Sequence, residues 1–210
     1  KDRFYLYQSR WRPNLPMAHI LPHWNWPERT GKVTPVHVFT SGDEAELFLN
    51  GKSLGRKKKG EYEYRLRWDD VVYEPGELKV ISYKNGKKWA EDLVKTTGEA
   101  TKIRLTADRD TISADGKDLS FVTVEILDDN GLVVPNATNK LSFSLEGPGE
   151  IVATDNGDPT DLTPFPSKTR KAFSGKALLI IKSAHKKPGL VTVSATSEGL
   201  KPAKINIQTN

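Results

Sequence analysis

The sequence contains no cysteine, which excludes disulfides, thiolate metal sites and cysteine nucleophiles. No apolar run approaches the ~20 residues of a membrane-spanning helix, so we expect no membrane insertion. The four histidines fall in no metal-binding spacing, and no glycine-rich phosphate loop or G-x-S-x-G motif occurs. The N-terminus also lacks the pattern of a signal peptide, so we expect either that a signal was removed or that this is an internal piece of a longer protein.

Positive charge is concentrated in one place. The net charge is +5, and its densest source is the run Arg56–Lys59. A nucleic-acid surface would spread basic residues over a face, beside aromatic residues or a recognition helix. Because these cations sit together between two glycines, Gly55 and Gly60, the run favours a solvated loop over a polyanion site. We expect no nucleic-acid partner.

What the sequence does have is short stretches of alternating apolar and polar residues, separated by scattered glycine (16) and proline (13). This pattern is typical of short strands joined by turns. Asn50-Gly51 and Asn85-Gly86 are strong hairpin signals. The segment from Tyr62 to Trp68 alternates aromatic or apolar residues with charged ones and predicts a strand. Ala177–Ile181 is continuously apolar and predicts a strand buried on both faces.

Helical periodicity occurs only over Asp2–Trp11, where Phe4, Tyr7 and Trp11 share one face. Overall the patterns predict an all-β fold of two consecutive Ig-like or fibronectin-like antiparallel β-sandwiches, with a short N-terminal helix and an irregular strap. We place the helix and strap in residues 1–32, the first sandwich in 33–98 and the second, Ig-like and invasin-like, in 99–210.

Candidate catalytic groups are scarce. The adjacent carboxylates Asp69-Asp70 and Asp128-Asp129 do not make an acid and a nucleophile facing each other across a sugar. Neighbours on a strand point to opposite faces, and the second pair lies in a predicted turn. We predict no catalytic residue.

Two binding sites are open to prediction. Trp24 and Trp26, in the aromatic strap, are candidates for stacking on sugar rings, although packing against a neighbouring domain also explains them. Asp155, Asp158 and Asp161 could offer oxygen ligands to Ca²⁺, although their spacing is not that of an EF-hand and such residues are also ordinary in turns. No other cofactor is expected. No strand pattern returns between this acidic loop and about Ala172, and so long a loop is often functional or docked onto a neighbour.

Several motifs together resemble bacterial β-galactosidases of glycoside hydrolase family 2. Phe4–Trp11 and Leu21–Pro27 resemble the junction just after the catalytic barrel of those enzymes. Glu46–Gly55 resembles the sandwich that follows the barrel. Asn156–Thr160, with Arg170–Gly175, resembles their last Ig-like domain. The resemblance covers nearly the whole chain in the family's order.

The resemblance implies non-catalytic accessory domains of an enzyme that cleaves terminal β-galactosides, or related β-glycosides, with retention. The substrate of that enzyme would be a β-galactoside or a polysaccharide. Its partner would be an upstream catalytic barrel of the same polypeptide, with Asp2–Trp11 as the tail of the barrel's last helical element. The family's catalytic glutamates lie on barrel strands, and no position here matches them. Family habit implies a periplasmic or extracellular location. Two alternatives stay open: a bacterial Ig-like surface spacer or adhesion module, and a carbohydrate-binding module.

Overall fold

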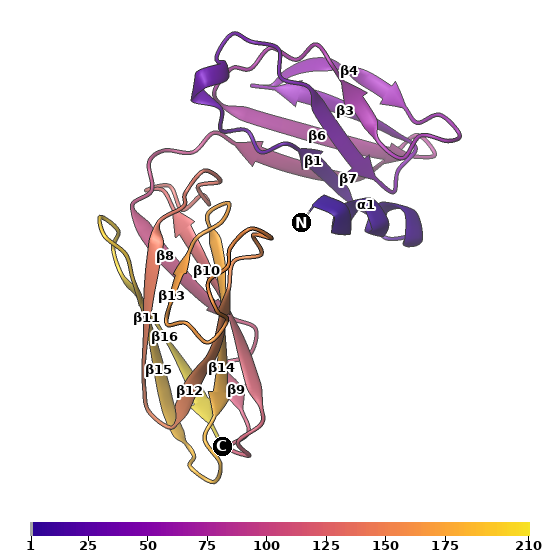
Figure 1. The fold of residues 1–210 in the computed structure, drawn as a ribbon. Helices are drawn as coiled ribbons and strands as arrows, with labels where there is room; N and C mark the ends of the chain where they lie inside the picture. The colour runs from indigo at the N-terminus through magenta and orange to yellow at the C-terminus, as the bar shows by residue number, and fades with distance from the viewer. Residues whose placement is uncertain (1) are drawn as a thin grey trace. The chain divides into compact units, whose positions relative to one another are not determined.

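The computed structural model describes residues 2–210, which divide into two compact units. The first unit ends at Thr96 and the second begins at Thr97. Each unit is built from two β-sheets whose strands pair almost entirely antiparallel, and one short helix lies at the N-terminal end (Figure 1). The predicted all-β fold with an N-terminal helix is therefore confirmed. In the described part of the chain, no helix is long and apolar enough to cross a membrane.

The first unit contains one α-helix, one 3₁₀ helix and seven strands. They are α1 Asp2–Trp11, β1 Ala18–Leu21, η1 Pro27–Arg29, β2 Val36–Thr40, β3 Glu44–Leu49, β4 Lys52–Lys58, β5 Leu66–Trp68, β6 Glu77–Lys84 and β7 Lys87–Lys95. One sheet has the order β1-β2-β5 and the other β4-β3-β6-β7. Alternate residues of both sheets point inward and form one buried core, as the period of two predicts.

Local turn chemistry fixes the two hairpins of the larger sheet. Asn50-Gly51 joins β3 to β4, and Asn85-Gly86 joins β6 to β7. All four residues have positive φ, between 49° and 81°. Asparagine and glycine tolerate this conformation, and its twist matches the twist of the flanking strands. Both hairpin predictions are confirmed.

The strap is more ordered than predicted. Within residues 13–32 the prediction of irregular chain is wrong at Ala18–Leu21, which pairs with β2 as strand β1. The amide of Ile20 also donates to Asp92 Oδ2 at 2.8 Å, which ties the strap to β7. This strand is short and lies between prolines, so its pairing depends on distant residues rather than on a local pattern.

Two other strand predictions are wrong in extent. Tyr62 and Tyr64 lie in a loop, and only Leu66–Trp68 pairs, as β5 against β2. Arg56–Lys58 lies in β4 rather than in a loop, and β4 is the edge strand of its sheet. The side chains of these three basic residues are still largely exposed.

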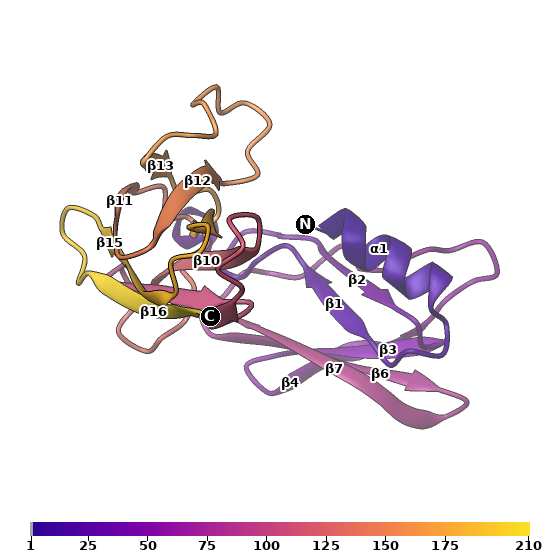
Figure 2. The ribbon, with the colours of Figure 1, turned by 90° about the horizontal axis from the view of Figure 1, so that it is seen from below.

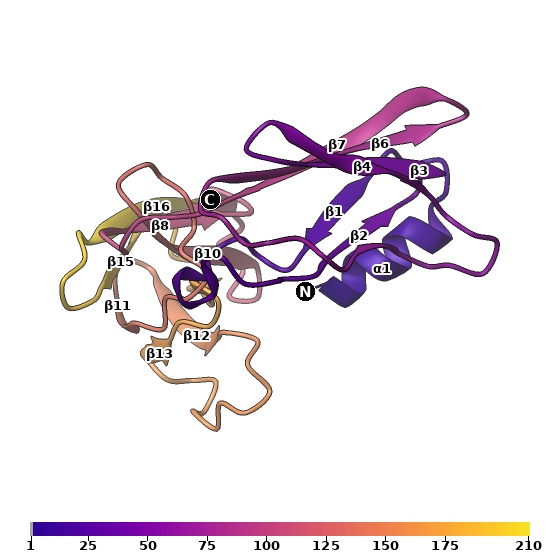
Figure 3. The ribbon, with the colours of Figure 1, turned by 90° about the horizontal axis from the view of Figure 1, so that it is seen from above.

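Helix α1 covers part of the smaller sheet of the first unit. Figures 2 and 3 show it lying across β1 and β2, on the side of that sheet that faces away from β3 and β6. The ring of Tyr5 stacks on His19 of β1 with centroids 3.7 Å apart. His19 Nε2 also lies 3.2 Å from Asp2 Oδ1. These contacts fix which face of the helix points away from the unit.

The second unit contains nine strands. They are β8 Lys102–Ala107, β9 Thr111–Ile112, β10 Leu119–Leu127, β11 Lys140–Glu146, β12 Gly149–Asp155, β13 Thr169–Lys171, β14 Lys176–Ser183, β15 Gly189–Thr196 and β16 Ala203–Thr209. Its sheets have the orders β12-β14-β10-β8 and β13-β11-β15-β16-β9, and one buried core lies between them. The short pairing of β16 with β9 is parallel.

Strand β14 is central in its sheet but is not buried on both faces as predicted. Ala177, Leu179 and Ile181 are buried in the core, whereas Leu178 and Ile180 on the other face are half-buried. The strand therefore alternates like its neighbours. The prediction of no strand before Ala172 is also wrong, because β13 begins at Thr169 and pairs with β11.

Candidate functional site

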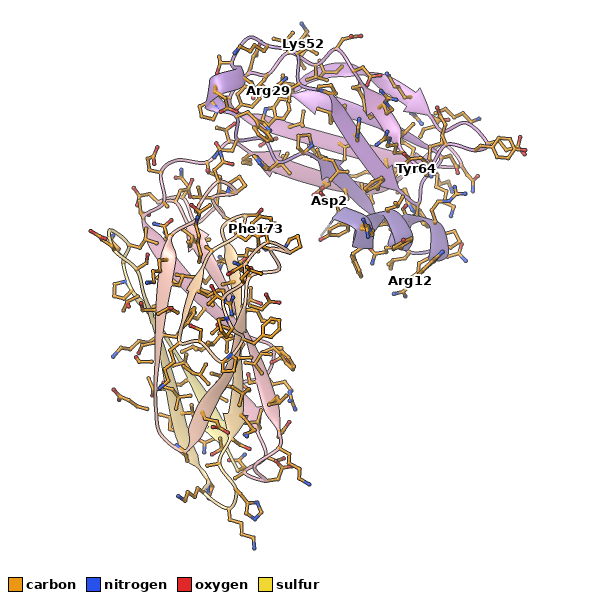
Figure 4. The ribbon with its side chains drawn as sticks, in the orientation of Figure 1. Asp2, Arg12, Arg29, Lys52, Tyr64 and Phe173 are labelled. Carbon is orange, nitrogen blue, oxygen red and sulfur yellow. The ribbon has the colours of Figure 1, made fainter. Side chains whose placement is uncertain are left out.

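The outward face of α1 is aromatic and exposed. Phe4, Tyr7 and Trp11 share this face, as the periodicity predicts, and they are 59%, 45% and 75% exposed. Tyr7 stacks on Trp11 with ring centroids 4.7 Å apart. With Gln8 and Arg12 these side chains line a hollow of about 270 Å³. Figure 4 labels Asp2 at the start of this helix and Arg12 just beyond its end. So many exposed aromatic side chains on one helix mark an interaction surface.

Trp24 is part of the core, not of a surface. It is fully buried against Tyr73, with ring centroids 4.8 Å apart, and its indole N–H donates to the Glu74 carbonyl at 2.9 Å. Its ring faces are therefore closed to a sugar, and the prediction that Trp24 stacks on a glycan is wrong. Trp24 does not pack against a neighbouring domain either, because its partners belong to its own sandwich.

Trp26 does not share a face with Trp24. It is half-buried and stacks on His23 with centroids 4.3 Å apart. Its indole N–H donates to the His23 carbonyl at 2.8 Å. Burial lowers the pKa of His23, so its ring favours the neutral form that stacks here. The two tryptophans do not form the shared sugar platform that their spacing predicts.

The acidic loop does not gather its carboxylates around a cation. Asp155 Oδ1 accepts from the amides of Asn156 and Gly157, and Asp158 Oδ1 accepts from Thr160. Asp161 instead pairs with Arg170. Within residues 2–210, no group of three or more acidic, histidine or cysteine side chains is placed to hold a metal ion. The structure therefore does not gather Asp155, Asp158 and Asp161 into the predicted calcium site, because turn amides and an arginine occupy these oxygens.

A buried arginine holds this loop in place. Arg170 of β13 is only 2% exposed. Its guanidinium donates to Thr154 Oγ1 and O, to Asp161 Oδ2, and to the carbonyls of Thr163 and Pro164, over 2.6–3.2 Å. Hydrogen bonds from Thr163, together with Arg170, hold the pKa of Asp161 well below its usual value.

The segment between β12 and β13, orange in Figures 2 and 3, extends away from the sheets of the second unit. It is nonetheless tied at its base by the bonds of Arg170. Two large apolar side chains project from it, Leu162 at 93% and Phe165 at 62% exposure. The resemblance in sequence pointed to this region, but no pattern in the sequence showed that Arg170 is buried.

A basic hollow lies between β4 and β5, which are edge strands of the two different sheets of the first sandwich. It measures about 480 Å³. The residues lining it are Lys57, Lys58, Glu63, Arg65, Leu66, Arg67 and Asp69. A smaller hollow of about 190 Å³ adjoins it and shares Lys57 and Asp69. The sequence signal for this site is the alternation of charged residues with Leu66 and Trp68, a pattern that by itself predicts only a strand.

The adjacent carboxylates are not built as a hydrolytic pair. Asp128 is buried, and its oxygens accept from the amides of Gly98 and Leu132. Asp69 and Asp70 both line the smaller hollow, but both are exposed, and Asp69 accepts two hydrogen bonds from Arg67 at 2.9 and 3.2 Å. Neither pair has the buried apolar setting that a glycosidase acid uses.

Comparison with known families assigns both units. Residues 103–206 match the model of glycoside hydrolase family 2 C-terminal domain 5, and residues 31–90 match a domain of unknown function, DUF4982. A β-galactosidase of Bacteroides ovatus is 44% identical over 207 residues, which cover 99% of this chain and 24% of that protein. A putative β-glucuronidase of Formosa agariphila is 35% identical over 205 residues, which cover 95% of this chain and 19% of that protein. A β-glucuronidase of the same organism is 27% identical over 214 residues, which cover 99% of this chain and 21% of that protein.

Solved structures of glycosidases also match nearly the whole chain. A β-glycosidase from Bacteroides vulgatus superposes with a TM-score of 0.93 and 34% identity, covering 99% of this chain and 26% of that one. A family 2 glycosyl hydrolase from Bacteroides cellulosilyticus gives a TM-score of 0.90 and 34% identity, covering 99% of this chain and 30% of that one. The chain thus spans about a quarter of the length of the curated relatives that it matches most fully.

Proposed function

We propose that this chain is the non-catalytic accessory region of a β-galactosidase. The chain belongs to glycoside hydrolase family 2, in which it corresponds to the C-terminal region of the enzymes. The bond-breaking carboxylates would lie in a catalytic domain of the same polypeptide. The identity of 44% to a β-galactosidase, against 35% to a putative β-glucuronidase and 27% to a β-glucuronidase, favours galactosides as substrates. The surroundings of Asp69-Asp70 and Asp128-Asp129 support a non-catalytic role, since neither pair is arranged as acid and nucleophile.

The observation that carries this proposal is the exposed aromatic face of α1. Phe4, Tyr7 and Trp11 leave a large apolar area in water, while the opposite face is fixed to β1 through Tyr5 and His19. A helix held in this way presents a rigid stripe to a partner. In the proposal, that partner is the catalytic domain, and the sandwiches stabilise it through this stripe.

The test compares two lengths of the protein. In the full polypeptide, the double variant Phe4→Ala, Trp11→Ala should lower the melting temperature and the β-galactosidase activity. In the 210-residue chain alone the same change should leave the melting temperature nearly unchanged, because both side chains are already exposed. Tyr62→Ala, at an exposed aromatic residue in a loop, is the matched control. Equal effects in the two lengths would refute docking through α1.

Substrate and catalytic role need separate assays. The 210-residue chain should hydrolyse neither a chromogenic β-galactoside nor a chromogenic β-glucuronide. The full polypeptide should turn over the galactoside at least about tenfold faster than the glucuronide, a preference of about 1.4 kcal/mol in transition-state binding. Turnover by the short chain would contradict the accessory role, and a preference for the glucuronide would contradict the substrate.

The proposal includes export to the periplasm or the cell surface, where polysaccharide substrates are met. Fractionation of the native host, with an antibody against this chain, tests that location. Recovery of the protein in the cytosolic fraction alone would contradict it.

A further inference from the structure

The two units differ sharply in charge. Residues 1–96 contain 18 Lys and Arg against 13 Asp and Glu, whereas residues 97–210 contain 14 of each. The whole excess of +5 therefore belongs to the first unit. A local excess of one sign raises the concentration of oppositely charged ligands near the surface that carries it.

Within the first unit, part of the excess positive charge lines a hollow and does not lie on a flat surface. The basic hollow between β4 and β5 is lined by four cations, Lys57, Lys58, Arg65 and Arg67. Cross-strand bonds fix its walls. Lys57 Nζ donates to the Arg67 carbonyl at 2.6 Å, and the indole N–H of Trp68 donates to the Gly55 carbonyl at 3.3 Å. The cations thus come from two sheets that these contacts hold together.

Three of the cations lack a carboxylate. Arg67 pairs with Asp69, but among residues 2–210 no acidic side chain forms an ion pair with Lys57, Lys58 or Arg65. Of these three, Lys57 donates to the Arg67 carbonyl, which leaves Lys58 and Arg65 as the cations open to an anion. Arg65 lies over the ring of Tyr64 at 5.1 Å and within 3.3 Å of His37 Nδ1. A guanidinium in this position keeps donors free for a planar anion such as a carboxylate, or for a sulfate.

The pKa of His37 reflects the positive electrostatic potential of the basic hollow. Burial lowers the pKa of His37, and the charges of Arg65 and Arg67 lower it further, while Asp69 opposes them. Its neighbour on β1 is the apolar Leu21. The imidazole therefore resists adding one more positive charge to this surface. An anion bound beside Arg65 would offset the part of this lowering of the His37 pKa that comes from the two arginines.

The mixture of charges favours a sugar over a nucleic acid. Glu63 and Asp69 stand among the four cations, and Asp70 lines the adjoining hollow. Carboxylates accept hydrogen bonds from sugar hydroxyls, but they repel a regular row of phosphates. Tyr64, which is 46% exposed and does not line the hollow, lies next to Arg65, whose guanidinium is 5.1 Å from the centre of its ring.

We propose that the basic hollow binds an anionic oligosaccharide, with Lys58 and Arg65 holding its carboxylate or sulfate group. This inference rests on the proposed function, because it treats the first unit as an accessory domain that retains a polysaccharide near a glycosidase. The proposed sugar site is non-catalytic, and it lies on a different surface of the first unit from the aromatic face of α1.

The experiment is calorimetric titration of the 210-residue chain with three probes: tri-galacturonate, a sulfated galacto-trisaccharide, and neutral galactotriose. At least one anionic probe should bind at least about tenfold more tightly than the neutral one and should weaken as salt rises from about 50 to about 300 mM. Binding of tri-galacturonate, of the sulfated probe, or of both supports the site and identifies the group it holds. Equal binding of all three, or of none, overturns it.

Matched variants locate the site. Lys58→Gln with Arg65→Gln should weaken the anionic probe at least about tenfold. Lys52→Gln with Lys87→Gln removes the same charge from exposed strand positions of the same unit and should change affinity less than about twofold. Figure 4 labels Lys52, at the opposite end of β4 from Lys58, and Tyr64, in the loop before β5. Equal losses in the two pairs would reduce the effect to net charge and overturn the site.

Two further readouts complete the test. The His37 pKa, followed by NMR, should rise when the anionic probe binds. Tighter binding of a single-stranded DNA of equal charge would assign the surface to nucleic acid and overturn the proposal. Since these measurements use the chain without a catalytic domain, failure here leaves the docking test of α1 untouched. If the α1 variants show no docking, the sugar-binding measurements still decide the proposal for the basic hollow.

Discussion

Replacing Arg170 by alanine removes a buried guanidinium that makes five hydrogen bonds inside the second unit. Truncating one partner of a buried ion pair typically costs about 3–5 kcal/mol. Carbonyls left without a donor add about 1–3 kcal/mol each if they stay dry. Because those of Thr163 and Pro164 lie in a surface loop that water can reach, we expect the lower end, about 3 kcal/mol.

The distribution of chromophores makes this loss measurable in one unit. All five tryptophans and all six tyrosines lie before Thr97, so intrinsic fluorescence follows only the first unit. Far-UV circular dichroism follows both. With a urea m-value of about 1.5–2 kcal/mol/M, a loss of 3 kcal/mol shifts the midpoint by about 1.5–2 M. Arg170→Ala should show this shift by dichroism and leave the fluorescence transition in place.

The matched control is Arg104→Ala. Arg104 also pairs with a carboxylate, on Glu125, but its side chain is 48% exposed. Such surface pairs contribute only about 0–1 kcal/mol. The reasoning about Arg170 is refuted if its variant loses no more stability than Arg104→Ala, or if fluorescence and dichroism shift together.

Three other changes have defined outcomes. Since the folded-state pKa of Asp161 is lowered, its contribution is complete above the unfolded value near 4 and is lost as pH falls below it. The fall in the second unit's urea midpoint between about pH 5 and 3 should therefore be shallower in Asp161→Asn. Trp24→Ala empties a fully buried site and should lower the fluorescence-detected stability by about 3–5 kcal/mol; a loss below about 1 kcal/mol would contradict its place in the core. Gly147→Ala puts a Cβ 2.1 Å from the Leu190 carbonyl at a φ of +104°. It should cost the second unit at least about 2 kcal/mol, whereas Gly199→Ala, with open space at φ +73°, should cost about 1 kcal/mol by the same dichroism assay.

Local chemistry made much of the fold predictable. The Asn-Gly pairs at Asn50 and Asn85 determine the turns of their hairpins, so the sequence predicts where β3 and β6 end and where β4 and β7 begin. It does not predict the second half of β4, where Arg56–Lys58 reads as a loop. Tyr62 and Tyr64 continue the alternating pattern but pair with no strand. The alternation begins several residues before Leu66, the first paired residue of β5. A period of two in hydrophobicity indicates which side chains are exposed, but it does not indicate whether a partner strand is present.

The sites were harder to predict, because burial is set by distant residues. Trp24 and Trp26 have the same local pattern, yet one lies against Tyr73 in the core and the other on His23 at the surface. Arg170 carries no sequence signal that it is buried, since its partners are loop carbonyls brought to it by the fold. The aromatic face of α1 was predictable because helical periodicity is local, while its exposure was not.

The loop held by Arg170 has a consequence for recognition. Most projecting loops must be ordered when something binds them, and that loss of freedom weakens the complex by about 0.5–1.5 kcal/mol for each immobilised side chain. Here residues 156–168 are already tied at their base, so Leu162 and Phe165 are presented on a loop whose backbone is largely fixed beforehand. A surface that covers them would retain most of the free energy of removing their apolar area from water.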